Sequence, residues 1–568
     1  MGARHHPLRP LCDLLIIEGS MTQSHASDRT LPTDLHQHAE GTGPDRKRSP
    51  LYLNRLPPCN AVCPAGENIQ SWLALAQAGD FKGAWLKLVE ENPLPAVHGR
   101  VCYHPCESAC NRKDLDQTVS IHALERFIGD LALKENWVLP RAESATGRRV
   151  MIVGAGPSGL SAAYHLARMG HTVEIFEAGP VTGGMLHFGI PAYRLPRAEL
   201  AHEIARIEAL GVRIHLNHKV EDVVEEMKHG AFDAAFIAIG AHLSKRVDIP
   251  AGEAARMLDA VSFLRGAENR PETLVGRRVA IYGGGNTAMD AARTAIRLGA
   301  VETLIIYRRD RDHMPAHPFE ADEALSEGVK INWLRTIKAM DEGAIQVEVM
   351  AMDDHGRPQP TGVYEELAAD TLILALGQDS DSAFLRKVEG MIFKADGTVE
   401  VDAGMMTGHP GIFAGGDMVP SERTVTVAVG HGKKAARHIN AWLKGQCYVK
   451  KEGRAEVLLK DLDVWYASEN HQEIQTERSL EERIMDFREV IQGLDETQAV
   501  YEAKRCLSCG NCFECDGCFG ACPEHAILKV GKRLGYRVDP SRCTGCAVCF
   551  EQCPTHAITM QKVEEGGL

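Results

Sequence analysis

Residues 512–553 contain eight cysteines in two runs of identical spacing. Both runs follow C-x2-C-x2-C-x3-C and are followed by proline: Cys512, Cys515, Cys518, Cys522, Pro523, and Cys543, Cys546, Cys549, Cys553, Pro554. This spacing is typical of two-cluster 4Fe-4S proteins, in which three thiolates of one run and the last cysteine of the other share a cubane. It predicts two clusters, one held by Cys512, Cys515, Cys518 and Cys553 and the other by Cys543, Cys546, Cys549 and Cys522. Zinc is the alternative, but a zinc ion takes only four ligands and fits two such runs badly.

The remaining cysteines are also clustered. Fifteen of the 17 fall within 59–110 and 506–553, and only Cys12 and Cys447 stand apart. Such grouping indicates metal ligands rather than a disulfide framework, and thiolate ligands require a reducing compartment, so we expect a cytoplasmic protein. The pair Cys506 and Cys509 lies just before the first run. We leave this pair open as spare thiols, alternative ligands or part of a further site.

A glycine motif follows the apolar stretch VMIV at 150–153. Gly154, Gly156 and Gly159 form G-x-G-x-x-G between an expected strand and helix. Such glycines allow a tight turn, close approach of a pyrophosphate to the backbone, and close packing of the helix on the strand. Glu177 ends the next strand, where an acid binds a ribose hydroxyl. The combination predicts a dinucleotide site.

A second unit of this kind has a different ending. Gly283, Gly285 and Ala288 form G-x-G-x-x-A, but the following strand ends in Arg308 and Arg309 rather than in an acid. Because a guanidinium binds a 2′-phosphate that a carboxylate would repel, we expect FAD at the first site and NADP(H) at the second. NAD(H) stays open, since the two arginines could be a solvated strand end.

A third segment supports the flavin. The sequence GIFAGGD at 411–417 is an apolar strand ending in Asp417, and the following TVTVAVGHGKKAARHI is typical of a helix start. We expect Asp417 to bind the ribitol or a phosphate-side hydroxyl of FAD.

Several ordered stretches carry a family resemblance: PPCNAVCPAGENI, GRVCYHPCESAC, GAGPSGL, GGMLHFGIPAYRLP, GGGNTAMD, YRRDRDHMPA and AGGD. The run from about 50 to 440 resembles the small (beta) subunit of glutamate synthase and the N-terminal half of dihydropyrimidine dehydrogenase. The resemblance implies a helical iron–sulfur domain, followed by a FAD domain into which a nicotinamide domain is inserted.

The motifs and the resemblance together give the expected site residues. Those expected at FAD are Gly154, Ala155, Gly156, Pro157, Ser158, Gly159, Glu177, Gly184, Met185, Arg194 (at the pyrophosphate), Gly416, Asp417 and Thr424. Those expected at NAD(P)H are Gly283, Gly285, Asn286, Thr287, Ala288, Arg308 and Arg309. No protein nucleophile is needed, since the two cofactors carry hydride transfer.

The resemblance assigns an N-terminal cluster to Cys63, Cys102, Cys106 and Cys110. The family holds two clusters there, but this chain lacks the upstream C-x2-C that would complete the second. Cys59 is left as an alternative ligand or a buried thiol, and Glu125 aligns with a side-chain ligand of the second cluster in some relatives. We expect one cluster here and leave the second open.

The predicted organisation is multidomain. The expected parts are a disordered extension (1–48), a helical 4Fe-4S domain (49–140), a Rossmann-like FAD domain (141–255 and 395–447), an inserted Rossmann-like NAD(P)H domain (256–394), a helical linker (448–500) and an α+β bacterial ferredoxin-like domain (501–568). The net charge of −14 argues against nucleic acid as a partner. No apolar run approaches the roughly 20 residues of a membrane helix.

Together these features predict an NAD(P)H-dependent iron–sulfur flavoprotein oxidoreductase. The fused ferredoxin suggests the electron-transfer subunit of a larger redox complex, of the 2-oxoacid:acceptor oxidoreductase type, or a donor to soluble ferredoxin. A glutamate synthase small subunit is the second hypothesis, and a non-enzymatic electron-wiring subunit is the third.

Overall fold

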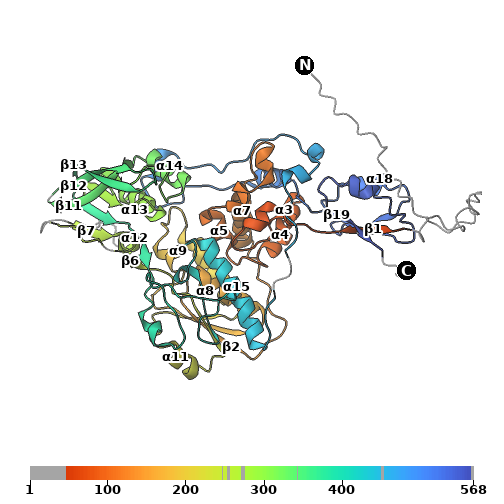
Figure 1. The fold of residues 1–568 in the computed structure, drawn as a ribbon, viewed down its shortest axis with the longest axis horizontal. Helices are drawn as coiled ribbons and strands as arrows, with labels where there is room; N and C mark the ends of the chain where they lie inside the picture. Colours follow the sequence, from red (N-terminus) through yellow and green to blue (C-terminus); the bar gives the residue numbers. More distant parts are fainter. Residues whose placement is uncertain are drawn as a thin grey trace, which may run out of the picture. The chain divides into compact units, whose positions relative to one another are not determined.

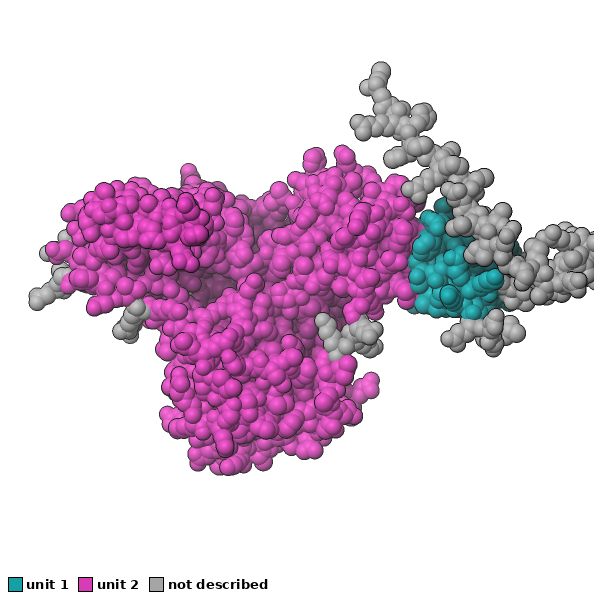
Figure 2. Space-filling view, viewed as in Figure 1, with its two compact units in different colours: residues 1–51, 516–552, 558–568 teal, residues 52–515, 553–557 magenta. Residues whose placement is uncertain are grey.

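The computed structural model describes residues 46–245, 247–251, 256–269, 275–341, 343–449 and 453–563. Of the predicted extension, residues 1–45 lie outside the described part. The chain divides into two compact units, which Figure 2 shows in different colours. Of the described residues, the smaller contains 46–51, 516–552 and 558–563, and the larger contains those within 52–515 and 553–557.

The larger unit begins with a group of helices. These are α2 (Pro58–Val62), α3 (Ile69–Gln77), α4 (Phe81–Leu88), α5 (Pro95–Val101), α6 (Pro105–Ser108) and α7 (Ile121–Lys134), with the 3-10 turn η2 (Asn111–Asp114). The side chain of Asp80 caps α4 by accepting from the Gly83 amide. Trp72 and Trp85 are fully buried, so the apolar faces of α3 and α4 form the core of this domain.

The first parallel sheet has the strand order β16-β5-β2-β3-β4. Its strands are β2 (Arg149–Val153), β3 (Thr172–Phe176), β4 (Arg213–His215), β5 (Ala234–Ile237) and β16 (Ile412–Ala414). The associated helices are α8 (Pro157–Arg168), α9 (Met185–Phe188), α10 (Arg197–Glu208), α11 (Val223–His229) and α15 (Val425–Leu443). In Figure 1, α8 and α15 lie side by side, and an added Cβ at Gly432 of α15 would come within 2.2 Å of the Ser158 carbonyl. Glycine therefore allows this close helix pair.

The second parallel sheet has the strand order β10-β9-β8-β14-β7. Its strands are β7 (Arg256–Asp259), β8 (Arg278–Tyr282), β9 (Glu302–Tyr307), β10 (Lys330–Trp333) and β14 (Thr371–Leu374), with helices α12 (Ala260–Asn269), α13 (Asn286–Arg297) and α14 (Pro318–Ser326). An antiparallel sheet of β11 (Arg335–Asp341), β12 (Ala344–Met352) and β13 (Pro358–Ala368) follows β10. Two parallel sheets with helices confirm the two predicted Rossmann-like folds.

The second fold interrupts the first in sequence. The chain leaves the first sheet after β5, builds the second, and returns as β16, which pairs with β5 in parallel. The two segments that connect the folds pair with each other as the short antiparallel strands β6 (Leu243–Ser244) and β15 (Gln378–Asp379). The 3-10 turns η4 (Ala383–Lys387) and η5 (Gly416–Met418) lie on the return path.

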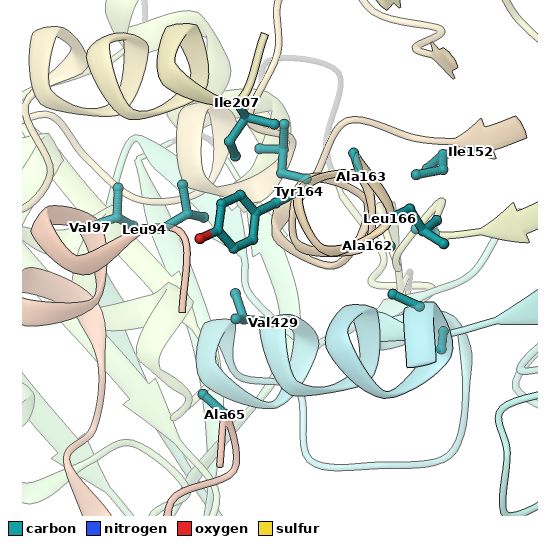
Figure 3. Packing of buried hydrophobic residues seen from close by; sticks show 14 of the residues in the cluster. Ala65, Leu94, Val97, Ile152, Ala162, Ala163, Tyr164, Leu166, Ile207 and Val429 are labelled. Atoms are coloured by element: carbon teal, nitrogen blue, oxygen red, sulfur yellow. The ribbon is translucent and has the colours of Figure 1, made fainter. Parts of the chain in front are cut away.

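Figure 3 shows how the helical domain packs on the first Rossmann-like fold. Tyr164 of α8 points toward Leu94 and Val97, and Val429 of α15 lies beside it. The tyrosine is fully buried, and its hydroxyl donates to the Val89 carbonyl. The two domains therefore share one continuous core.

The segment 453–504 runs back along the helical domain. It contains η6 (Leu459–Asp461), η7 (Val464–Tyr466), α16 (Leu480–Arg483) and α17 (Glu496–Lys504). Arg126 of α7 donates to the Ile491 carbonyl at 3.0 Å, and the Ser120 hydroxyl donates to the Glu473 carbonyl at 2.7 Å. Much of the predicted linker is therefore bound to the helical domain.

The smaller unit contains two two-stranded sheets and two short helices. Its elements are β1 (Arg48–Tyr52), α18 (Gly517–Ala521), β17 (Ile527–Lys529), β18 (Tyr536–Val538), α19 (Val548–Glu551) and β19 (Ile558–Lys562). Strand β1 pairs with β19. The sequence prediction had begun the helical domain at residue 49, but residues 48–51 form part of the cysteine-rich C-terminal unit, because β19 offers them a sheet edge.

Candidate cofactor sites

The first glycine turn joins β2 to α8. An added Cβ at Gly159 would lie 2.0 Å from the Gly154 carbonyl oxygen, so only glycine lets the helix approach the turn this closely. An added Cβ at Gly156 meets nothing within 4 Å. This leaves open space in front of the start of α8, where a pyrophosphate would face the helix N-terminus.

Glu177 follows β3 and holds this turn. Its carboxylate accepts from the Ala155 amide at 2.8 Å and from the Gly179 amide at 2.7 Å. The acid predicted for the ribose thus also fixes the backbone beside the glycine motif.

Two distant segments converge on the same turn. An added Cβ at Gly184, just before Met185 starts α9, would lie 3.1 Å from the Gly156 Cα. An added Cβ at Gly416 would lie 3.1 Å from the Ser158 Cβ, and Pro157 stands at the start of α8. The structure therefore gathers predicted residues of three segments around the first glycine turn.

Asp417 and Thr424 lie beside the start of α15. Burial raises the pKa of Asp417 to about 6, against the opposing charge of Arg423. Thr424 caps α15, its hydroxyl oxygen accepting from the Val427 amide at 3.2 Å. The sequence did not single out His431, whose Nδ1 accepts from the Gly416 amide at 3.2 Å.

Arg194 takes partners other than the expected one. Its Nη1 lies 2.9 and 2.8 Å from the two carboxylate oxygens of Asp290 on α13, and its Nη2 contacts Glu320 on α14. The guanidinium is therefore engaged with the second Rossmann-like fold. The predicted contact with the FAD pyrophosphate has no support in these contacts, because two carboxylates occupy its donors.

The second glycine turn joins β8 to α13. An added Cβ at Gly285 meets nothing within 4 Å, as at Gly156. Asn286 begins α13; its amide group donates to the Tyr103 hydroxyl at 2.6 Å and accepts from the His317 amide at 2.9 Å. Thr287 is half-buried and Ala288 is buried.

The two predicted 2′-phosphate ligands follow β9. Arg308 is exposed, whereas Arg309 is half-buried. The Nε of Arg309 is buried and has no hydrogen-bond partner. A buried donor without a partner is costly, so an anionic ligand fits this position.

Cys63, Cys102 and Cys106 lie together in the helical domain. Burial raises the pKa of the Cys106 thiol well above its usual range, and the neighbouring thiols Cys102 and Cys63 add to this. Thr426 of α15 donates from its hydroxyl to the Cys102 sulfur at 3.1 Å. The sequence did not reveal this link between the iron–sulfur domain and the helix that starts beside Asp417.

Glu125 is buried next to this group. It accepts from the Asn92 amide at 2.8 Å, and its carboxylate adds to the raised pKa of the Cys102 and Cys63 thiols. A carboxylate beside these three thiols can serve as a fourth ligand by chemistry, whereas the resemblance had aligned Glu125 with a ligand of the second cluster.

Cys110 lies in a different place. It lines a small pocket together with Cys59, Cys506 and Cys509. Burial raises the pKa of Cys59, with further contributions from the other three thiols of this pocket. The structure thus brings the unassigned cysteines together with a cysteine that was predicted to serve the first N-terminal cluster.

The ferredoxin-like cysteines fall into two sets. Cys522, Cys543, Cys546 and Cys549 line one small pocket within the smaller unit. This is the crossed set expected from the spacing. The other predicted set is divided: Cys512, Cys515 and Cys553 belong to the larger unit and Cys518 to the smaller.

Comparison with protein families matches three regions. Residues 148–432 match the pyridine nucleotide-disulphide oxidoreductase model, 54–137 match dihydropyrimidine dehydrogenase domain II with its 4Fe-4S cluster, and 536–559 match the 4Fe-4S binding domain. The chain belongs to the pyridine nucleotide-disulphide oxidoreductase family. It carries iron–sulfur modules on both sides of that region, and the expected resemblance is confirmed.

Characterised relatives extend over most of the chain. The NADP(+)-dependent formate dehydrogenase subunit beta of Moorella thermoacetica is 39% identical, covering 80% of this chain and 70% of the relative. The NADPH-Fe(3+) oxidoreductase subunit beta of Geobacter sulfurreducens is 35% identical, covering 81% and 77%. The glutamate synthase [NADPH] small chain of Escherichia coli is 32% identical, covering 68% and 89%.

These matches confirm the predicted enzyme class. The chain is an iron–sulfur flavoprotein oxidoreductase that uses FAD, NAD(P)H and 4Fe-4S clusters. Among the described residues, no helix combines the length and apolar character required to cross a bilayer.

Proposed function

We propose that this chain is the electron-transfer subunit of a multi-subunit oxidoreductase and connects NADP(H) to a partner subunit through its iron–sulfur modules. The observation that carries the proposal is the hydrogen bond from Thr426 to Cys102, because α15 starts beside Asp417, a predicted flavin ligand. One helix thus contacts both the predicted flavin site and a predicted cluster ligand.

The chemistry follows from the groups that the chain would hold. FAD, when bound, supplies the exchange between two-electron hydride transfer and the one-electron steps of iron–sulfur clusters. The residues that would hold it are those around Gly154–Gly159, with Glu177, Gly184, Met185, Gly416, Asp417 and Thr424. Gly283, Gly285, Asn286, Thr287, Ala288, Arg308 and Arg309 would hold the nicotinamide nucleotide.

The preference for NADP(H) over NAD(H) rests on the two arginines after β9. At the equivalent place of the first fold stands an acid, Glu177, whose carboxylate accepts hydrogen bonds from two backbone amides. Arg308 and Arg309 offer positive charge instead, which suits a 2′-phosphate. Two of the relatives carry NADPH in their names and a third carries NADP(+).

The partner defines the substrate of the complex. The chemistry of the fused cysteine-rich unit favours a redox partner, and a 2-oxoacid-oxidising enzyme is our first expectation. Two relatives are beta subunits, one of a formate dehydrogenase and one of an Fe(3+) oxidoreductase, which supports a complex. Thiolate ligands require reducing conditions, so we place the complex in the cytoplasm.

Two experiments test the proposal. Oxygen-free protein should bleach in the flavin and cluster bands when NADPH is added, with NADH the poorer donor; a colourless protein, or an unchanged spectrum, would refute it. Purification from native extract should yield partner subunits. A thiamine-diphosphate enzyme would support the 2-oxoacid expectation, a formate-oxidising subunit would replace it, and an amidotransferase would indicate a glutamate synthase.

A further inference from the structure

Four cysteines from opposite ends of the larger unit line one small pocket. Cys59 lies in α2, Cys110 precedes η2, and Cys506 and Cys509 follow α17, about 400 residues later in the chain. Cys59 is buried and the other three are half-buried, with Pro58 and Leu507 among the other lining residues. The pocket lies within one compact unit.

The late pair is held firmly against the helical domain. Arg505, next to Cys506, donates to the carbonyls of Thr118 and Gln117, both at 2.7 Å. Glu502 is fully buried and accepts from the backbone amides of Ser120 at 2.7 Å and Glu473 at 2.8 Å. These contacts fix α17 and the loop that follows it at the edge of the pocket.

Polar donors point at the sulfurs. Asn111 donates to the Cys509 sulfur at 3.4 Å and to the Val457 carbonyl at 2.9 Å. The Ser508 amide donates to the Cys506 sulfur at 3.4 Å. Hydrogen bonds of this kind stabilise thiolates that ligate a metal or a cluster.

The spacing of the sulfurs distinguishes a cluster from a single ion. A zinc ion with Zn–S bonds of about 2.3 Å requires neighbouring sulfurs about 3.8 Å apart. Among the described residues, the groups of three or more ligand atoms within 4.8 Å of one another are His104–Glu107–His122 and Glu67–His98–Glu125. No three sulfurs of the four-cysteine pocket lie within 4.8 Å of one another, so the pocket does not have the close sulfur spacing that a single zinc ion requires.

We infer that Cys59, Cys110, Cys506 and Cys509 hold a 4Fe-4S cluster whose ligands come from both ends of the larger unit. This rests on the proposed function and deepens it by adding a cluster to the path. The C-x2-C pair that the N-terminal segment lacks is thus supplied by residues 506–509. Cys63, Cys102 and Cys106 then form a separate site, with Glu125 beside them.

The new site has a connection toward the ferredoxin-like runs. The Tyr466 hydroxyl donates to the Leu507 carbonyl at 2.7 Å. Burial raises the pKa of Tyr466, and the thiols of Cys509, Cys506, Cys515 and Cys553 add to this. Tyr466 therefore lies near cysteines of both the new site and the first ferredoxin-like set.

The test compares two variants purified without oxygen. Cys506→Ala/Cys509→Ala should lose about a quarter of the iron and acid-labile sulfide, since one of four cubanes is removed. One EPR signal of the reduced protein should vanish while the FAD content stays at the parent level. The exposed Cys447 provides the control, and Cys447→Ala should keep all the iron. Full iron and all EPR signals in the double variant would overturn the inference.

A second measurement needs no variant and so remains decisive if the double variant misfolds. The unaltered protein should contain about 16 iron atoms per chain and no stoichiometric zinc. About 12 iron atoms, with or without one zinc, would overturn the inference. A different result would refute the proposed function alone. If the protein contained about 16 iron atoms but was not reduced by NADPH, the cluster site would be supported and the proposed function refuted.

Discussion

Thr426 donates a hydrogen bond from its hydroxyl to the sulfur of Cys102, with the two atoms 3.1 Å apart. Thr426 is buried in the first turn of α15, whereas Cys102 follows α5 of the helical domain. The contact joins the two parts of the chain between which electrons are proposed to pass.

Removing this bond should make the cluster at Cys102 harder to reduce. A hydrogen bond to a ligating sulfur stabilises the more negative, reduced state. For Thr426→Val we expect the potential of one cluster to fall by about 40 mV, which corresponds to about 1 kcal/mol for one electron. An EPR-monitored redox titration measures this. Thr361→Val, which alters an exposed strand, should leave all potentials in place; equal shifts in both variants would contradict the assignment.

Glu177 should control flavin retention. Its two oxygens accept from the Ala155 and Gly179 amides, and glutamine can offer only one acceptor oxygen in their place. We expect Glu177→Gln to weaken FAD binding about tenfold, or about 1.4 kcal/mol. Free flavin fluorescence after dialysis reports the loss. Glu221→Gln, at an exposed position, is the control and should retain FAD; retention by both variants would show that the turn does not depend on the charge.

Arg308 and Arg309 should set nucleotide preference. Charge-assisted hydrogen bonds to a phosphate contribute about 1.5–3 kcal/mol, so Arg308→Ala/Arg309→Ala should raise KM for NADPH roughly 10- to 100-fold. KM for NADH should change little, because NADH has no 2′-phosphate. Steady-state reduction of a viologen dye measures both. Arg311→Ala, which removes an exposed ion pair with Asp322, should change neither. A parallel rise for both nucleotides would refute the assignment.

The sequence predicted those features that depend on local spacing. The glycine turns at Gly154 and Gly283 join a strand to a helix as expected, since the motif itself dictates that geometry. The crossed set of Cys522 with Cys543, Cys546 and Cys549 also shares one pocket. In both cases the chemistry is contained in short runs.

Features that depend on distant contacts were beyond sequence reasoning. Cys506 and Cys509 meet Cys59 and Cys110 only because segment 453–504 folds back, and no local pattern encodes that path. The unassigned C-x2-C pair was nevertheless a signal, because it matched the missing pair in type and spacing. Arg194 was placed at FAD by resemblance alone, and its pairing with Asp290 depends on the second fold.

Asp417 should give the flavin-free protein a pH-dependent stability. Burial raises its pKa to about 6, above the unfolded value near 3.8, so the carboxyl stays protonated to a higher pH in the folded state than in the unfolded state. Stability from this group is therefore present at low pH and is lost as pH rises through 6. Between pH 5 and 8 the loss is about 1.4 kcal/mol, and Asp417→Asn should remove it.

The advantage of Asp417→Asn in free energy of unfolding should thus grow with pH, as followed by denaturant unfolding. Asp354→Asn, at an exposed site, should show no such trend, and a flat difference for Asp417→Asn would place its carboxyl in a water-like environment.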